Sequence, residues 1–247
     1  MRDASELRAA LRGAPMVGIW ANVPSPLTAE AAAAAGADYV VVDQQHGAVD
    51  PTAMLAMLQA IALGGAAPLV RVSANDPWVI GNALDLGALG VIVPMVESAA
   101  EAAAAVAASR YAPAGRRSIG VVRGASPGAE PADPVCLVMV ETRAGLEAVE
   151  GIAATDGLDG IYIGPSDLSL SLGLTPTRLL EHPPVLDAID RVREVCAASG
   201  RLCGLHCLAA EDVPRHAPAG FSMLTLGADL QYLRDALAAA VATARGA

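Results

Sequence analysis

The sequence carries few positive charges and no long apolar run. Its 16 Lys and Arg residues face 26 Asp and Glu residues, which gives a formal net charge of −10. Nucleic-acid-binding proteins need clustered Lys and Arg to neutralise phosphates, so this class is excluded. No run approaches the roughly 20 apolar residues of a membrane span. We therefore expect a soluble, acidic protein with a large core, since 54% of its residues are hydrophobic.

An export signal is also missing. The opening residues MRDASELRAALRG alternate charge with alanine and lack the apolar centre of a signal peptide. We therefore expect a cytoplasmic protein whose cysteines, Cys136, Cys196, Cys203 and Cys207, are reduced thiols. His206 lies between two of them, but no second ligand pair at zinc-site spacing follows. The pattern favours buried thiols over a zinc site.

Eight short apolar runs alternate with alanine-rich stretches of helical length, most of which close on glycine. Eight βα units in 247 residues predict a single-domain α/β protein, a (β/α)8 TIM barrel over residues 1–247. An open doubly wound sheet is the alternative, but a Gly-x-Gly-x-x-Gly turn after the first run is missing. The runs are 16–21, 39–44, 68–72, 90–96, 136–141, 160–165, 202–207 and 221–227. Residues 111–134, rich in Pro, Gly and Arg, are predicted to form a long loop.

Polar residues stand where several of these runs end. Asp43 lies near the end of the second run and His46 just after it, while Arg71 lies near the end of the third run and His206 near the end of the seventh. Catalytic groups of a barrel come from the carboxyl ends of its strands, so these side chains are expected at one rim. Taken alone, Asp43 is better interpreted as the cap of the following helix, and His46 fits an ordinary loop histidine as well as a general base. Arg71 lies between valines and is expected to point into the barrel mouth.

Glu141 and Asp167 follow consecutive apolar runs, the fifth and the sixth. A bare buried carboxylate is costly, so Glu141 should be paired, metal-bound or at the rim. Asp167 alone could be the N-cap of a short helix, DLSLSLG. Together the two carboxylates are typical of a hard-cation site for Mg²⁺ or Mn²⁺. The turn Gly164-Pro165-Ser166 beside them would offer backbone amides to an anionic carboxylate.

These residues, taken in order, resemble the HpcH/HpaI aldolases, which are metal-dependent class II pyruvate aldolases. The resemblance covers nearly the whole chain. It rests on DQQHG at 43–47, PLVRV at 68–72 with ND at 75–76, ALDLGALGVIVPMV at 83–96, RYAPAGRRSIG at 110–120, VMVETRAGL at 138–146 and DGIYIGPSDLSLSLG at 159–173.

The resemblance implies a role for each matching residue. Glu141 and Asp167 match the two protein ligands of a divalent metal, Mg²⁺, Mn²⁺ or Co²⁺, and Arg71 matches the arginine that steadies the keto oxygen. His46 matches the acid/base histidine. Asp43 and Asp85 match carboxylates that partner this histidine or its water network. The amides around Gly164, Pro165 and Ser166 match the cradle for the carboxylate of pyruvate.

The implied reaction is reversible cleavage of a 4-hydroxy-2-oxo acid into pyruvate and an aldehyde. A histidine suits removal of the C4 hydroxyl proton because imidazoles ordinarily titrate near neutral pH. The resemblance also implies a homo-oligomer, commonly a hexamer, with small-molecule substrates and no nucleic-acid or membrane partner. The alanine-rich ending at 229–247 is expected to be a helix that packs on a neighbouring subunit or on the barrel itself.

Two other functions remain open. One is a CoA-thioester lyase of the citrate lyase beta or malyl-CoA lyase type, which would need a basic CoA pocket. The other is a non-catalytic barrel that binds a 2-oxo acid. Gln45 stands before His46 where some well-known family members have Glu. This departure leaves the identity of the aldehyde open.

Overall fold

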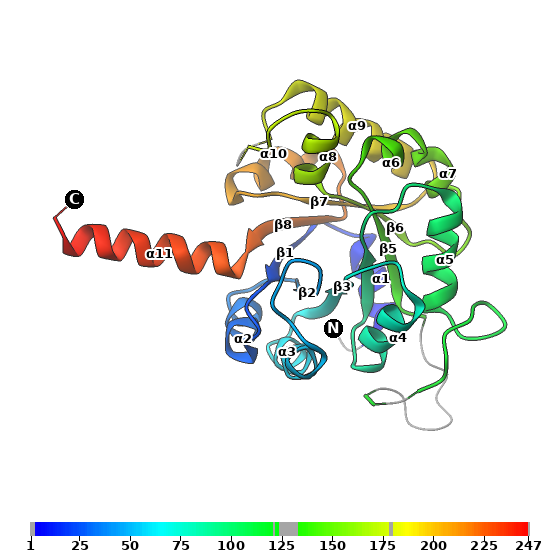
Figure 1. Cartoon of the computed structure of the whole chain (residues 1–247), viewed down its shortest axis with the longest axis horizontal. Coiled ribbons are helices and arrows are strands. Elements are labelled where there is room, and N and C mark those ends of the chain that lie inside the picture. The colour runs from blue at the N-terminus through cyan, green and yellow to red at the C-terminus, as the bar shows by residue number, and fades with distance from the viewer. Residues whose placement is uncertain (1–2, 121, 124–132, 178–179, 247) are drawn as a thin grey trace.

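The computed structural model describes residues 3–120, 122–123, 133–177 and 180–246, and eight parallel strands of this part close into a barrel (Figure 1). Each strand pairs with the next, and β8 pairs with β1. The strands are β1 (Met16–Ala21), β2 (Tyr39–Asp43), β3 (Ala67–Arg71), β4 (Gly90–Val93), β5 (Val135–Val140), β6 (Gly160–Ile163), β7 (Leu202–His206) and β8 (Met223–Ala228). The predicted TIM barrel is confirmed.

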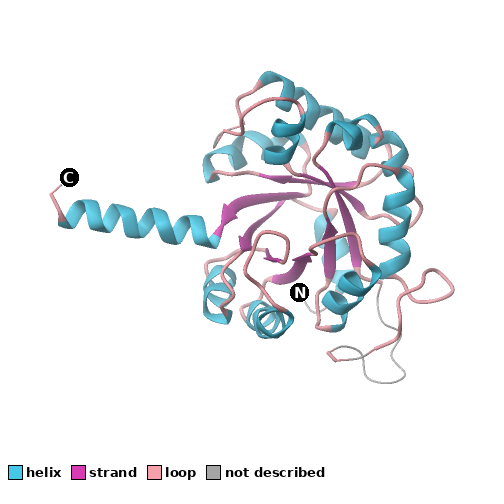
Figure 2. Cartoon of the chain, viewed as in Figure 1, coloured by secondary structure: helices cyan, strands magenta, loops and turns pink. Residues whose placement is uncertain are grey.

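Helices follow the strands along the chain, and most of them lie around the outside of the barrel, whereas α11 projects away from it (Figures 1 and 2). They are α1 (Ala4–Leu11), α2 (Pro26–Ala34), α3 (Pro51–Leu63), α4 (Pro77–Asp85), α5 (Ala99–Ser109), α6 (Arg143–Glu147), α7 (Val149–Ala153), α8 (Pro165–Ser171), α9 (Pro183–Ala198), α10 (Val213–His216) and α11 (Asp229–Ala244). Short 3₁₀ turns, Ala210–Asp212 and Ala217–Ala219, flank α10. Part of the predicted loop 111–134 lies outside the described residues.

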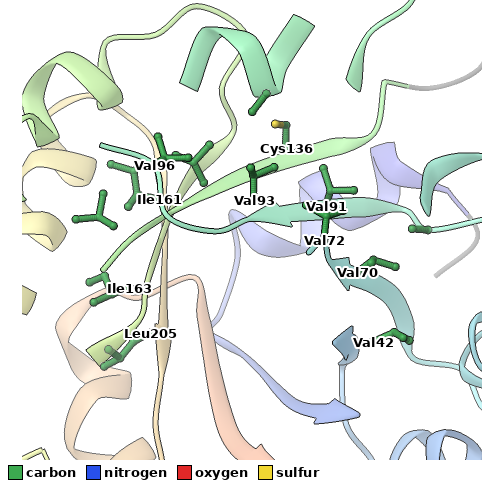
Figure 3. Packing of buried hydrophobic residues seen from close by; sticks show 14 of the residues in the cluster. Val42, Val70, Val72, Val91, Val93, Val96, Cys136, Ile161, Ile163 and Leu205 are labelled. Carbon is green, nitrogen blue, oxygen red and sulfur yellow. The ribbon is translucent and has the colours of Figure 1, made fainter. Parts of the chain in front are cut away.

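Strand residues alternate between two separate apolar layers. Outward residues such as Val42, Val70 and Ile161 pack under the helices, as Figure 3 shows. Inward residues such as Tyr39, Leu69 and Tyr162 fill the barrel, because successive side chains of a strand point to opposite faces. Both layers are fully buried, which explains why most strands read as unbroken apolar runs.

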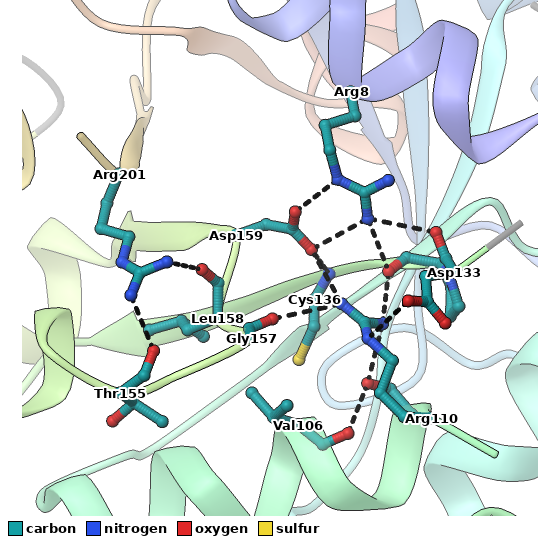
Figure 4. Close-up of polar contacts among 12 residues, drawn as sticks. Arg8, Val106, Arg110, Asp133, Cys136, Thr155, Gly157, Leu158, Asp159 and Arg201 are labelled. Carbon is teal, nitrogen blue, oxygen red and sulfur yellow. Dashed lines mark hydrogen bonds and ion pairs between the residues drawn. The ribbon is translucent and has the colours of Figure 1, made fainter. Parts of the chain in front are cut away.

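Helix α1 closes the end of the barrel where the strands begin. Its Leu7 and Leu11 belong to the inner layer. Beside it Asp159, just before β6, accepts hydrogen bonds from Arg8 Nε at 2.6 Å, Arg110 Nη2 at 3.2 Å and the Cys136 amide at 2.9 Å (Figure 4). This network joins α1, α5 and β5, and it lies at the end of the barrel opposite the carboxyl ends of the strands.

Replacing Asp159 by Asn should destabilise the fold strongly. The substitution leaves the buried Arg110 guanidinium and the partly buried Arg8 guanidinium short of their counter-charge, a change that costs about 3 kcal/mol or more. Urea denaturation measures the loss, and Asp156→Asn, an exposed position three residues away, is the control. An Asp159→Asn midpoint equal to that of the control would contradict the structural role.

Candidate active site

Four inward-facing side chains gather in the barrel mouth, the end formed by the carboxyl termini of the strands. They are Trp20 of β1, Asp43 of β2, Arg71 of β3 and His206 of β7. Each continues the inward alternation of its strand, so strand geometry alone brings them together.

Asp43 and Arg71 form a bidentate ion pair between neighbouring strands. Arg71 Nε lies 2.9 Å from Asp43 Oδ1, and Nη2 lies 2.7 Å from Oδ2. The two residues are 1% and 7% exposed. The guanidinium carbon also lies 4.2 Å from the centre of the Trp20 ring, a cation–π arrangement. Trp20 therefore forms a platform on which the paired arginine rests.

Asp43 accepts further hydrogen bonds from the loop that follows β2. The amides of Gln45 and His46 donate to Oδ1 at 3.0 and 3.3 Å. The next helix, α3, is capped instead by Asp50, whose carboxylate accepts from the Ala53 amide. The interpretation of Asp43 as a helix cap is therefore wrong. Its carboxylate holds Arg71 and the backbone of His46 together, while the His46 side chain is exposed at the rim.

Glu141 follows β5 and is 1% exposed. Its Oε1 accepts the Met95 amide at 2.7 Å, whereas Oε2 has no partner among the described residues. Met95 has φ +56°, a conformation that is rare outside glycine. Burial raises the pKa of Glu141 to about 7; the Met95 N–H partly opposes the rise, and the Asp167 carboxylate adds to it.

Asp167 lies in the first turn of α8, whose N-cap is Gly164. The interpretation of Asp167 as the N-cap is therefore wrong. Gly164 has no room for a side chain, because a Cβ would lie 2.5 Å from Glu141 Oε2. Its own amide donates to the Val140 carbonyl at 3.4 Å, whereas the Ser166 amide has no acceptor among the described residues and is available to a ligand. Pro165, the first residue of α8, has no N–H to offer.

The pair of carboxylates fits a hard cation. A buried carboxylate oxygen without a hydrogen-bond partner is costly unless a cation or a proton satisfies it. The described residues contain no group of three or more His, Cys, Asp or Glu that could hold a metal ion. Glu141 and Asp167 would therefore share a cation with water and substrate oxygens, which suits Mg²⁺ and similar ions.

Asp85 is not brought to this site within the chain. It is the last residue of α4, and because α4 runs back from the mouth, Asp85 lies at the opposite end of the barrel. There its carboxylate pairs with Arg117 at 2.6 Å, and the Arg117 guanidinium stacks on Tyr111. The predicted role of Asp85 as a partner of His46 stays a prediction, because the fold of one chain keeps the two residues at opposite ends of the barrel.

His206 is held with one ring nitrogen unsatisfied. Its ring meets Trp20 edge-on, with 4.9 Å between the centroids, and Nδ1 has no partner among the described residues. Burial and, to a lesser extent, the Arg71 charge lower the pKa of His206 to about 4, while Asp43 opposes the change. His206 is therefore neutral at pH 7.

All four cysteines are free and buried, which confirms the prediction of buried thiols.

The sequence arguments missed three residues of the site: Trp20, Met95 and Asn22. Trp20 could have been found, because it occupies an inward position of the first predicted strand. The Met95 contact depends on a backbone conformation that residue type does not indicate. Asn22 follows β1, and its Nδ2 donates to Asp43 Oδ2 at 3.0 Å.

We compared the chain with known protein families, curated proteins and solved structures. Residues 16–236 match the family model described as HpcH/HpaI aldolase/citrate lyase. The chain belongs to this family. It is 40% identical over 239 residues to a hydroxypyruvate/pyruvate aldolase of Rhizorhabdus wittichii, covering 94% of this chain and 95% of that protein.

Two further relatives agree. A 5-keto-4-deoxy-D-glucarate aldolase of Salmonella paratyphi C is 35% identical over 226 residues, which cover 88% of each chain. The crystal structure of an HpcH/HpaI aldolase/citrate lyase family protein from Burkholderia cenocepacia superposes with a TM-score of 0.88 at 32% identity, covering 97% and 99% of the two chains. The predicted family and enzyme class, an aldolase and thus a carbon–carbon lyase, are confirmed. No helix of the described residues is long and apolar enough to cross a membrane.

His206 makes stability depend on pH. The unfolded state binds its proton below about pH 6.5, whereas the folded state resists protonation until about pH 4. Stability should therefore fall as pH drops through this window, by at most about 3 kcal/mol from this residue. Urea midpoints between pH 7.5 and 4.5 should drop less for His206→Leu than for the wild type. The control is His182→Gln at the start of α9, and equal pH profiles for wild type and His206→Leu would contradict the assignment.

Proposed function

We propose that the protein is a divalent-metal-dependent aldolase that reversibly cleaves a 4-hydroxy-2-oxo acid to pyruvate and an aldehyde. The observation that carries this proposal is the unpartnered, buried Oε2 of Glu141. It lies beside Asp167 and faces the same barrel mouth as Arg71. The names of the relatives support a 2-oxo acid as substrate.

Glu141 and Asp167 would hold the cation, Mg²⁺, Mn²⁺ or Co²⁺. When bound, it would supply a Lewis acid that polarises the 2-oxo group, so that C3 can carry negative charge. An imine route is not open to the printed chain, because all 16 of its basic residues are arginine and it contains no lysine. This favours metal dependence over the lysine-based alternative for making the same enolate.

Arg71 is placed to steady the oxygen of that enolate. Its Nε and Nη2 are committed to Asp43, so Nη1 remains for a ligand above Trp20. A guanidinium held by a buried carboxylate and an aromatic ring needs little reorganisation when charge develops on the substrate. The Ser166 amide would receive the substrate carboxylate.

His46 would accept the C4 hydroxyl proton. Its backbone is fixed by Asp43, while its side chain is exposed at the rim, where an aldehyde would leave. A base must come within hydrogen-bond reach of the proton that it removes. From the rim, the His46 imidazole could reach the C4 hydroxyl of a substrate bound in the mouth. Neighbouring Gln45 has a buried side-chain oxygen, Oε1, without a partner among the described residues, and it would line the aldehyde side.

The test needs no knowledge of the aldehyde. Purified protein with pyruvate in D₂O should exchange the methyl protons in the presence of Mg²⁺, Mn²⁺ or Co²⁺ and lose this activity with EDTA. Glu141→Gln and Asp167→Asn should each lower exchange by about 100-fold or more, because each removes part of the charge stabilisation. The control is the exposed Glu147→Gln. Proton exchange by the wild type that continues in EDTA would contradict metal dependence. Cleavage of a CoA thioester without exchange of pyruvate protons would favour the CoA-thioester lyase.

We also propose that the protein works as a homo-oligomer in which α11 packs on a neighbouring copy. Figures 1 and 2 show α11 projecting away from the barrel, and it has no buried residue. Leu233, Leu237 and Val241 are 47%, 58% and 48% exposed and recur every four residues, so they share one face.

The barrel has a matching uncovered surface. Outward residues of the other strands are fully buried under helices, whereas Val17 and Ile19 of β1 and Leu226 of β8 remain partly exposed. A helix that follows β8 would normally cover this position. Since α11 of the same chain points away, α11 of a second copy is the occupant that fits both surfaces. A hexamer, and a location in the cytoplasm, stay predictions.

Replacing Leu237 by Asp should lower the molar mass measured by light scattering after size-exclusion chromatography. The new charge would have to be buried in the apolar contact, which is unfavourable. Ala239→Asp, on the opposite face of α11, should keep the wild-type mass. A monomeric wild type, or a Leu237→Asp variant of unchanged mass, would contradict the docking of α11.

A further inference from the structure

Asn22 lies at a junction of three segments. Its backbone amide donates to Asp229 Oδ1 at 2.9 Å, its carbonyl accepts the Ala48 amide at 3.2 Å, and its Nδ2 donates to Asp43 Oδ2 at 3.0 Å. These contacts join the end of β1 to the root of α11, to the loop after β2 and to the buried ion pair.

The orientation of the Asn22 amide follows from its partner. An ionised carboxylate can only accept hydrogen bonds, so the atom that faces Asp43 must be the NH₂ group. The side-chain oxygen then points elsewhere, and it is buried without a partner among the described residues. Leaving this oxygen unsatisfied costs free energy. The hydrogen bond from Asn22 Nδ2 to the Asp43 carboxylate must therefore be worth more than that cost.

Asp43 Oδ2 is shared between two donors, Asn22 Nδ2 and Arg71 Nη2. A carboxylate that lost one of them could rotate or shift, and the bidentate arginine would move with it. The guanidinium would then leave its position 4.2 Å above the Trp20 ring. Among the described residues Asn22 forms no hydrogen bond to Arg71 or to Trp20, so its hydrogen-bonding link to the arginine runs through Asp43.

We propose that Asn22 is a positioning residue that sets the orientation of Arg71 through Asp43, and that Asp229 couples it to the root of α11. Its catalytic consequence rests on the function proposed above, whereas its structural part does not.

Asp229 supplies the second half of the connection. It is the first residue of α11, and its carboxylate accepts the amides of Asn22, Val23 and Leu230. Any displacement of the root of α11 therefore reaches the backbone of Asn22. Docking of α11 on a second copy would hold this root in place and with it the Asp43–Arg71 pair.

A readout independent of activity comes from the tryptophans. The chain has two, Trp20 under Arg71 and Trp78, which is 79% exposed. In a Trp78→Phe parent all tryptophan emission comes from Trp20, and Arg71→Leu calibrates the signal when the guanidinium is absent. Asn22→Ala should move the emission toward that of Arg71→Leu. The control Asn75→Ala, which loses a surface hydrogen bond to the Glu101 carbonyl, should not.

Exchange of pyruvate protons in D₂O supplies the second readout. Loss of a hydrogen bond to a charged group should lower kcat about 10-fold or more, with a smaller change in KM, because Arg71 acts most strongly on the enolate. Asn22→Asp keeps the shape but places a like charge beside Asp43, so it should be no more active than Asn22→Ala. Asp229→Asn should act in the same direction more weakly, and Asp235→Asn on the same helix is its control.

Each outcome decides between the two proposals. Unchanged Trp20 emission in Asn22→Ala overturns the positioning role, and so does an Asn22→Asp variant more active than Asn22→Ala, which would indicate packing alone. A parent without metal-dependent exchange overturns the proposed function, while the emission still decides the role of Asn22. Changed emission with a fall in kcat supports both.

Discussion

The buried pair between Asp43 and Arg71 is the interaction on which the barrel mouth depends. Two charges removed from water are tolerated only when their remaining hydrogen-bonding atoms are satisfied. Here Asp43 accepts from five donors, two of them on Arg71 and the others on Asn22, Gln45 and His46. Satisfying one carboxylate thus fixes β1, β2, β3 and the loop that carries the proposed base.

The opposite wall of the mouth is built on a different principle. Glu141 keeps one carboxylate oxygen unsatisfied, and burial together with Asp167 raises its pKa to about 7. A proton or a bound cation can compensate for such a group, and strongly raised pKa values are typical of functional sites. One wall is therefore complete in the isolated chain. The other keeps a buried carboxylate oxygen without a partner among the described residues, at the place where the proposed cation and substrate would bind. The first wall would hold Arg71 rigidly in position, and the second would bind the proposed ligands.

The fold and much of the site could be predicted from the sequence, because strand alternation and the order of the strands decide both. Asp43, Arg71 and Glu141 lie at the carboxyl ends of their strands for this reason, and Asp167 lies in the helix that follows β6. Their catalytic and metal-binding roles stay predictions. The pairing of Asp43 with Arg71 was not predicted, since it depends on the register between β2 and β3. The contacts of Met95 and Asn22 arise from loop conformation, which a residue pattern does not indicate. The direction of α11 is not given by the pattern either, because an amphipathic helix can pack on its own barrel or, as proposed above, on a second copy.

The network around Asp159 stabilises one end of the barrel, and the candidate active site lies at the other end. Arg8, Arg110 and Asp159 lock the closed end, far from the loops that would meet an aldehyde. Under the proposed function, replacements near Gln45 would therefore alter the preference for the aldehyde while the network around Asp159 stays unchanged. A scaffold of this kind can accumulate changes in specificity over evolutionary time without first acquiring a compensating gain in stability.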